Sequence, residues 1–376
     1  MRNIHRLLVG AIISVGGVSV FADTPEEVSE RSKAASAYDR TQPYPAYEAP
    51  QLAIGQPDIQ GVWTNTTLTS TTRPARLGDR LVYTEEEVAE LEQSKAETLA
   101  LASQPTEADA PAEHQEPEGV STAAGVGSGA PYNEFWTDRG NTVMRVNGEP
   151  RTSLFTTPDG QAPARKPGAR PAPAPEPAAF VKLLGPGPSK GASYDNPESR
   201  SSERCIVGFG RNAGPPMFSN GWYNNNYQIV QTPDHVMIAT EMIHDARIIR
   251  LNAEHRTDDA RPYFGDSIGW WEGDTLVVET THIPYEQQYM GSWKDLKVTE
   301  RFRRVADDRL YYGFTIEDPT LWEEPWGGEY EFDALNDRVH EYACHEGNYS
   351  LPGILRGARE QERQDRLSSI GADEEG

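Results

Sequence analysis

Basic residues are scarce in this sequence. Its 376 residues include 35 lysines and arginines against 58 aspartates and glutamates, which gives a formal charge of −23. A surface of this sign repels the phosphates of nucleic acids and anionic lipid headgroups. We therefore expect no nucleic-acid partner and interpret the acidity as a source of solubility or an adaptation to a salty habitat. An acidic surface for a cationic partner is the alternative.

Cysteine occurs only twice, at Cys205 and Cys344. Neither has a second cysteine nearby, which argues against a cysteine-based zinc site. In an oxidising compartment the pair favours one disulfide. It would close a loop of about 140 residues and add about 3–5 kcal/mol in the chain-entropy model. Two buried free thiols are the alternative.

Several signatures of enzyme families are missing. There is no Gly-rich strand-to-helix turn for a nucleotide. Ser267 in GDSIG matches Gly-x-Ser-x-Gly but lacks the strand-to-helix context of an activated serine, so we expect a turn residue there. No His-x-His or His-Glu-x-x-His occurs either. We expect no organic cofactor, and no metal is assigned. A metal on Glu241, His244, Asp245 and His345 remains an alternative, because the residue types fit although their spacing is not diagnostic.

Long apolar runs are confined to the N-terminus. Arg2 and Arg6 precede an apolar stretch over 7–20, and Val20-Phe21-Ala22 offers the small residues that a signal peptidase reads. We predict a signal peptide over 1–22, export to the periplasm or the medium, and no membrane insertion of the mature chain.

The remainder predicts one β-rich domain over 58–358, after an extended linker over 23–57. One helix should start after Thr84, where Glu87 completes a capping box. Low-complexity insertions near 101–130 and 160–200 lack the apolar residues that would offset their ordering entropy, so we expect disorder there. Residues 359–376 read as a charged tail.

Short strands alternate with turn residues between 203 and 358. We predict four hairpins, turning at 232–234, 272–274, 306–308 and 336–337. A Gly-Val-Trp strand at 61–63 precedes them. The fold class is therefore mainly β: an antiparallel up-and-down meander that closes into a barrel, because closure removes exposed strand edges. The Gly-Val-Trp strand followed by such a meander resembles calycin-like (lipocalin-like) barrels.

Several motifs together resemble a group of uncharacterised exported bacterial proteins: EMIHDARII from 241, WEGDTLVVETT from 271 and YACHEGNY from 342. The resemblance covers roughly 55–358. It implies the barrel architecture and export, and it transfers no catalytic residue.

The first candidate site is EMIHDARIIRL, residues 241–251, where charges lie among isoleucines. On a continuous strand, Glu241, Asp245 and Arg247 share one face and His244 lies on the other. This row either lines a wet cavity or forms a solvent-facing ladder of ion pairs, and a bulge near His244 would re-aim part of it. In a cavity, Glu241 would serve as acid or base and Arg247 would stabilise negative charge.

The second candidate site is CHEGNY, where the last predicted strand ends. His345 beside Glu346 is an alternative general base, and a turn residue is the other interpretation. Flat aromatic faces beside amides suit sugar rings or planar molecules. The residues that we expect to line a substrate are Trp222, Asn225, Tyr227 and Trp271.

The leading hypothesis is an exported, cofactor-independent enzyme that uses acid–base chemistry on a small neutral or sugar-like molecule, as a lyase, isomerase or hydrolase. One alternative is a lipocalin-like carrier of a small apolar ligand. Another is a non-catalytic interaction module of the cell envelope. The placement of Glu241, Asp245 and Arg247 distinguishes them, because burial together favours an enzyme.

Overall fold

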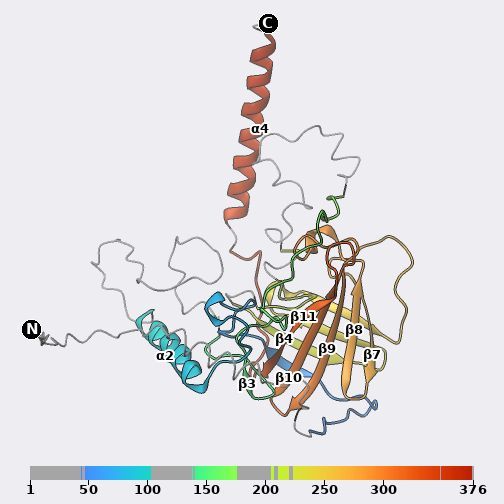
Figure 1. The fold of residues 1–376 in the computed structure, drawn as a ribbon. Helices are drawn as coiled ribbons and strands as arrows, with labels where there is room; N and C mark the ends of the chain where they lie inside the picture. Colours follow the sequence, from blue (N-terminus) through green and yellow to red (C-terminus); the bar gives the residue numbers. More distant parts are fainter. Residues whose placement is uncertain are drawn as a thin grey trace, which may run out of the picture.

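The computed structural model describes residues 44, 47–102, 138, 140–175, 205–206, 211–219, 223–347 and 349–374. They form a closed barrel with helix α2 (Glu85–Ala102) beside it and helix α4 (Ser350–Glu374) projecting away from it (Figure 1). The predicted signal peptide and nearly all of the insertion over 101–130 lie outside the described residues. Within the described part of the chain, no helix is long and apolar enough to cross a membrane.

Nine strands make up the barrel. They are β1 (Gly61–Thr64), β4 (Asn226–Gln231), β5 (His235–Thr240), β6 (Ala246–Leu251), β7 (Asp266–Glu272), β8 (Thr275–Thr281), β9 (Lys297–Ala306), β10 (Arg309–Glu317) and β11 (Trp326–Ala334). Strands β4 to β11 follow one another in sequence order, and β1 closes the barrel between β11 and β4. The predicted mainly β, closed barrel is confirmed.

One strand pair departs from the antiparallel meander. Strands β6 and β7 run parallel, with Ile249 opposite Ser267. A parallel pair needs a connection of a dozen or more residues to carry the chain back to the same end. The connection over 252–265 is long enough for this return, whereas the other neighbouring strands of the meander are antiparallel.

Three of the four predicted hairpins are confirmed, namely β4–β5, β7–β8 and β9–β10. The fourth is wrong: residues 338–347 form no strand, and β11 pairs with β10 and β1 instead. Because β1 already occupies the free edge of β11, no further strand can join the barrel there.

The single strand expected over 235–251 is also wrong. A one-turn helix (Met242–His244) separates β5 from β6. Ile243 and His244 adopt left-handed backbone angles, with φ of 58° and 46°. This turn breaks the side-chain alternation, so Glu241 and Arg247 do not belong to one row on one strand.

Helix α2 starts as predicted. Glu87 Oε2 accepts a hydrogen bond from the Thr84 N–H at 2.8 Å, and the Glu87 N–H donates to Thr84 Oγ1 at 3.3 Å. This reciprocal pair is the capping box. The helix packs through Val88 and Leu91 on a small cluster that includes Tyr83 and Val143.

Two segments are more structured than the sequence predicted. The tail after 359 continues α4 to Glu374. The Pro/Ala-rich stretch over 160–175, which we expected to be disordered, is held by tryptophan side chains. Trp322 Nε1 donates to Pro163 O at 3.2 Å and Trp293 Nε1 donates to Ala172 O at 3.1 Å. The remainder of that predicted insertion, residues 176–200, lies outside the described residues.

Candidate functional site

A bidentate ion pair lies inside the barrel. Arg247 of β6 donates to Glu300 of β9, with Nη1–Oε2 at 2.7 Å and Nη2–Oε1 at 3.0 Å. The Arg247 side chain is 2% exposed and that of Glu300 is 0% exposed. Tyr312 Oη also donates to Glu300 Oε1, at 2.8 Å. The charge of Arg247 is therefore balanced by Glu300, a residue that the sequence analysis did not select.

Residues 211–219 close the barrel interior, and we call this segment the plug. The Met217 N–H donates to Tyr312 Oη at 2.8 Å, and Tyr330 Oη donates to Met217 O. Arg247 Nη2 lies 3.7 Å from Met217 Sδ. Met217 is fully buried in the main core cluster. Side chains of the barrel interior therefore contact both the backbone and the side chain of Met217 in the plug.

The interior tyrosines stay neutral. Burial, with the charge of Glu300 second, raises the pKa of Tyr312 well above its usual value. Burial and the neighbouring Tyr227 raise the pKa of Tyr330 in the same way. Burial also raises the pKa of Tyr227, whose ring centroid lies 5.5 Å from that of Phe332. The hydroxyls of Tyr312 and Tyr330 therefore act as neutral donors and acceptors.

Glu241 is buried at the turn between β5 and β6, where it accepts three hydrogen bonds. The donors are Asn224 Nδ2 at 2.6 Å, Asn226 Nδ2 at 3.2 Å and the backbone N–H of His340 at 3.2 Å. In this position Glu241 joins the turn to β4 and to the segment after the barrel. Its neighbour in sequence, His244, is exposed.

The other predicted residues are dispersed. Asp245 is half-buried, and His345 and Glu346 are exposed after the barrel. Asn225 is buried and accepts a hydrogen bond from Asn212 at 2.8 Å, while Trp271 packs against the edge of the core. Trp222 lies outside the described residues. The catalytic and substrate-lining roles assigned to these residues stay predictions.

The predicted disulfide is present between Cys205 and Cys344. It is typical of proteins in an oxidising compartment. His345 Nδ1 lies 3.8 Å from Cys205 Sγ, so His345 lies beside this bridge.

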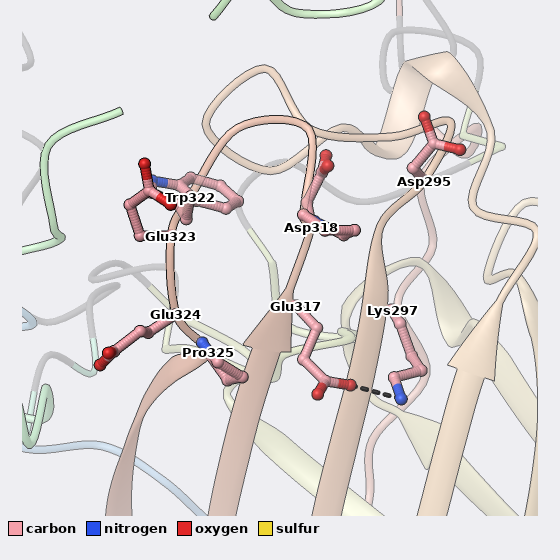
Figure 2. A pocket seen from close by; sticks show the side chains of 9 residues that line it. Asp295, Lys297, Glu317, Asp318, Trp322, Glu323, Glu324 and Pro325 are labelled. Carbon is pink, nitrogen blue, oxygen red and sulfur yellow. Dashed lines mark ion pairs between the residues drawn. The ribbon is translucent and has the colours of Figure 1, made fainter. Parts of the chain in front are cut away.

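An open cleft of about 370 Å³ lies at one end of the barrel, and we call it the rim cleft. It lies between the end of the β8–β9 connection and the β10–β11 loop (Figure 2). Its lining residues are Asp295, Lys297, Glu317, Asp318, Pro319, Trp322, Glu323, Glu324 and Pro325. Five of these are carboxylates and one is a lysine, so the lining is strongly acidic.

The single lysine of the rim cleft is held in place. Lys297 Nζ lies 2.5 Å from Glu317 Oε2, as Figure 2 marks, and 3.4 Å from Glu279 Oε2. The hydrogen bond to Glu317 raises the pKa of Lys297, so this group is a cation at neutral pH and no base. Within the described chain, Asp295 and Glu324 make no ion pair and are exposed. Their charges are available to a ligand.

A second cleft of about 540 Å³ lies against the same loop and shares Trp322, Glu323, Glu324 and Pro325 with the rim cleft. Phe314, Trp326 and the Thr156–Pro158 strip add to its wall. The loop sequence EDPTLWEEPW, dense in carboxylates and tryptophan, was the signal for both clefts. Neither these tryptophans nor these carboxylates were selected from the sequence as candidate site residues.

A further polar cluster lies outside the barrel wall. His255 Nδ1 contacts Asp266 Oδ2 at 2.8 Å, and its Nε2 contacts Glu279 Oε1 at 3.2 Å. Burial opposes the charge of Asp266, but the Arg256 N–H, His255 and Arg250 outweigh it and lower the pKa. No group of three His, Cys, Asp or Glu residues in the described chain has an arrangement that holds a metal ion.

Comparison with known proteins adds little to this geometry. No protein-family model matches the chain, and no curated protein matches it. A solved structure that matches is the crystal structure of a mutant of the fluorescent protein UnaG, at 14% sequence identity and a TM-score of 0.21. The match covers 37% of this chain and 89% of that chain. The barrel assignment rests on the strand pairing described above.

Proposed function

We propose that this protein binds a small organic cation in the rim cleft. The observation that carries the proposal is the lining itself, with five carboxylates, one lysine and a tryptophan around about 370 Å³. Cavities of roughly 300–1,000 Å³ are the usual size for small-molecule sites. Carboxylates attract an ammonium group directly, and Trp322, which is 3% exposed, adds apolar wall to the cleft.

The chain's charge supports the same ligand class. The formal charge of −23 attracts cations to the protein before contact. At the rim cleft, Glu317 is partly neutralised by Lys297, and Glu323 lies 3.4 Å from Lys166 Nζ. Asp295 and Glu324 remain to receive the ligand. An anionic or purely apolar ligand would leave these charges uncompensated.

Isothermal titration calorimetry with choline, spermidine, glucose and acetate tests the proposal. We expect the two cations to bind, and to bind more weakly as salt is added, because salt screens exposed charges. Asp295→Asn/Glu324→Gln should weaken cation binding on the order of tenfold. The matched control is Asp274→Asn/Glu254→Gln, which removes two exposed charges that do not line the cleft. Binding of glucose alone, or equal loss in both double variants, would contradict the proposal.

Acid–base turnover of a small neutral or sugar-like molecule is the second proposal. What supports it is Glu241, a carboxylate that is 4% exposed and surrounded by asparagine amides. A panel of nitrophenyl glycosides, assayed with the wild type and Glu241→Gln, tests it. Hydrolysis that disappears in a folded Glu241→Gln variant would favour this enzyme over a simple binding protein. The carrier of an apolar ligand has less support, because Met217 and aromatic rings occupy the interior among the residues that the structure describes.

Export to the periplasm or the medium is part of the proposal. The arginines and apolar run of residues 1–22 support it, and the Cys205–Cys344 disulfide agrees with an oxidising compartment. N-terminal sequencing of the protein recovered outside the cytoplasm tests it, since we expect the mature chain to begin at Asp23.

A further inference from the structure

The disulfide joins two segments that are distant in sequence. Cys205 precedes the plug, and Cys344 follows His340, whose backbone N–H donates to Glu241. The sequence separation of the two cysteines is 139 residues. The bridge therefore ties Cys205, which precedes the plug in the sequence, to the segment that leaves the barrel.

This bridge is accessible and has a histidine beside it. Both cysteines are half-buried and His345 is exposed. His345 Nδ1 lies 3.8 Å from Cys205 Sγ. The charged groups of the same segment (338–347) are Arg338, Glu341 and Glu346, all exposed, and the described residues across the bridge, Cys205 and Ile206, carry no charge. A histidine N–H in this position stabilises a thiolate that forms on Cys205.

We propose that Cys205–Cys344 is a thiol–disulfide exchange site for a dithiol, and that His345 directs the exchange. A thiolate of the dithiol attacks Cys344 Sγ, a new S–S bond forms there, and Cys205 leaves with the electron pair as a thiolate beside His345. The second thiol of the dithiol then attacks the sulfur that the dithiol contributed to the mixed disulfide, and Cys344 leaves as a thiol. The protein disulfide gains two electrons and two protons, and the dithiol becomes a cyclic disulfide.

Exchange at this site has a consequence for the barrel interior. With the bridge open, Cys205 loses its covalent tie to Cys344, while Met217 keeps only its hydrogen bonds and packing inside the barrel. The reduced protein should therefore expose Met217 more often than the oxidised protein does. Met290, which is 45% exposed, provides an internal reference.

The first experiment measures reduction of the full-length oxidised protein by dithiothreitol, with alkylation of released thiols and mass spectrometry. We expect His345→Gln to slow reduction about five- to tenfold at pH 6, because a leaving thiol of lower pKa departs faster. The difference should shrink at pH 8.5, where histidine is less protonated. His340→Gln, another exposed histidine of the same segment, should match the wild type. Equal rates for the wild type and His345→Gln at both pH values would overturn the proposal.

Two further readouts exclude a merely structural role for His345. Glutathione should be trapped on Cys344 rather than on Cys205, and His345→Gln should lose this preference. After reduction and alkylation, peroxide should oxidise Met217 several-fold faster than it does in the disulfide-bonded protein, with Met290 as the reference. The variant Cys205→Ser/Cys344→Ser should behave like the reduced protein. Glutathione on Cys205 in the wild type would contradict the assigned leaving group. Unchanged protection of Met217 would contradict the link to the plug.

Discussion

The barrel interior and the rim cleft both place carboxylates beside one basic side chain, but they balance charge differently. Inside, Arg247 and Glu300 form a bidentate pair with almost no exposure, and Tyr312 completes the coordination of the carboxylate. At the rim, Lys297 faces several carboxylates in an open cleft. A buried charge is tolerated only when it is paired, whereas an exposed excess is solvated. The first arrangement therefore serves the fold, and the second is free to serve a ligand.

Glu300→Gln tests the buried ion pair of the barrel interior and should have the largest effect. It leaves Arg247 without a counter-charge in the core, so we expect a loss of about 3–5 kcal/mol in the free energy of unfolding, measured by urea denaturation. Arg247→Met/Glu300→Leu should cost less than either single charge deletion, because no unpaired charge remains. A single variant as stable as the wild type would show that the pair is not buried.

Met217→Ala tests the plug. Removing a fully buried thioether side chain leaves a cavity among Tyr312, Tyr330 and Arg247. We expect a loss of about 2–4 kcal/mol in unfolding free energy. Met290→Ala, at an exposed methionine, is the control and should change stability by less than about 0.5 kcal/mol. Similar losses in both variants would argue against a plug.

Lys297→Met tests how the charge of the rim cleft affects binding. Without this cation, Glu317 and Glu279 lose their shared partner, and the cleft becomes more acidic. We expect choline to bind about three- to tenfold more tightly, in proportion to one unscreened unit charge. Lys294→Met removes an exposed lysine that does not line the cleft, so its choline affinity should stay near that of the wild type. No change in Lys297→Met would place the cation site elsewhere.

Glu324→Gln has the smallest expected effect on the fold. Its side chain is exposed and makes no ion pair in the described chain. The unfolding free energy should change by less than about 0.5 kcal/mol, while choline affinity should fall about threefold. A large loss of stability in Glu324→Gln would show that this carboxylate also supports the fold, as Glu300 does. Urea denaturation of both variants measures the difference.

Local chemistry could be predicted wherever it involves neighbours in sequence. The capping box of Thr84 and Glu87 and the turns at 232–234, 272–274 and 306–308 follow from short patterns, and all are present. The predicted hairpin at 336–337 was wrong because the partner of a strand depends on tertiary structure, and β1 pairs with the free edge of β11. The row from Glu241 failed because left-handed angles at Ile243 and His244 are unusual for such residues.

The candidate site depended on tertiary structure still more. Glu300 pairs with Arg247 across 53 residues, and Met217 meets Tyr312 across 95. Nothing in the local patterns around these residues indicates that they meet. The rim cleft, by contrast, gathers the two connections that flank the predicted β9–β10 hairpin, whose register sets Lys297 opposite Glu317.

By itself, the sequence determined a mainly β barrel, an acidic surface, one capped helix and one cysteine pair. These properties depend on residue composition and on the periodicity of short segments, and both can be read directly from the sequence. Only the tertiary structure decided that Arg247 is balanced by Glu300, that Met217 fills the interior, and that unpaired carboxylates gather at the rim. The reason is physical: whether a charge is compensated depends on what lies within a few ångströms of it, and closure of the barrel sets those neighbours.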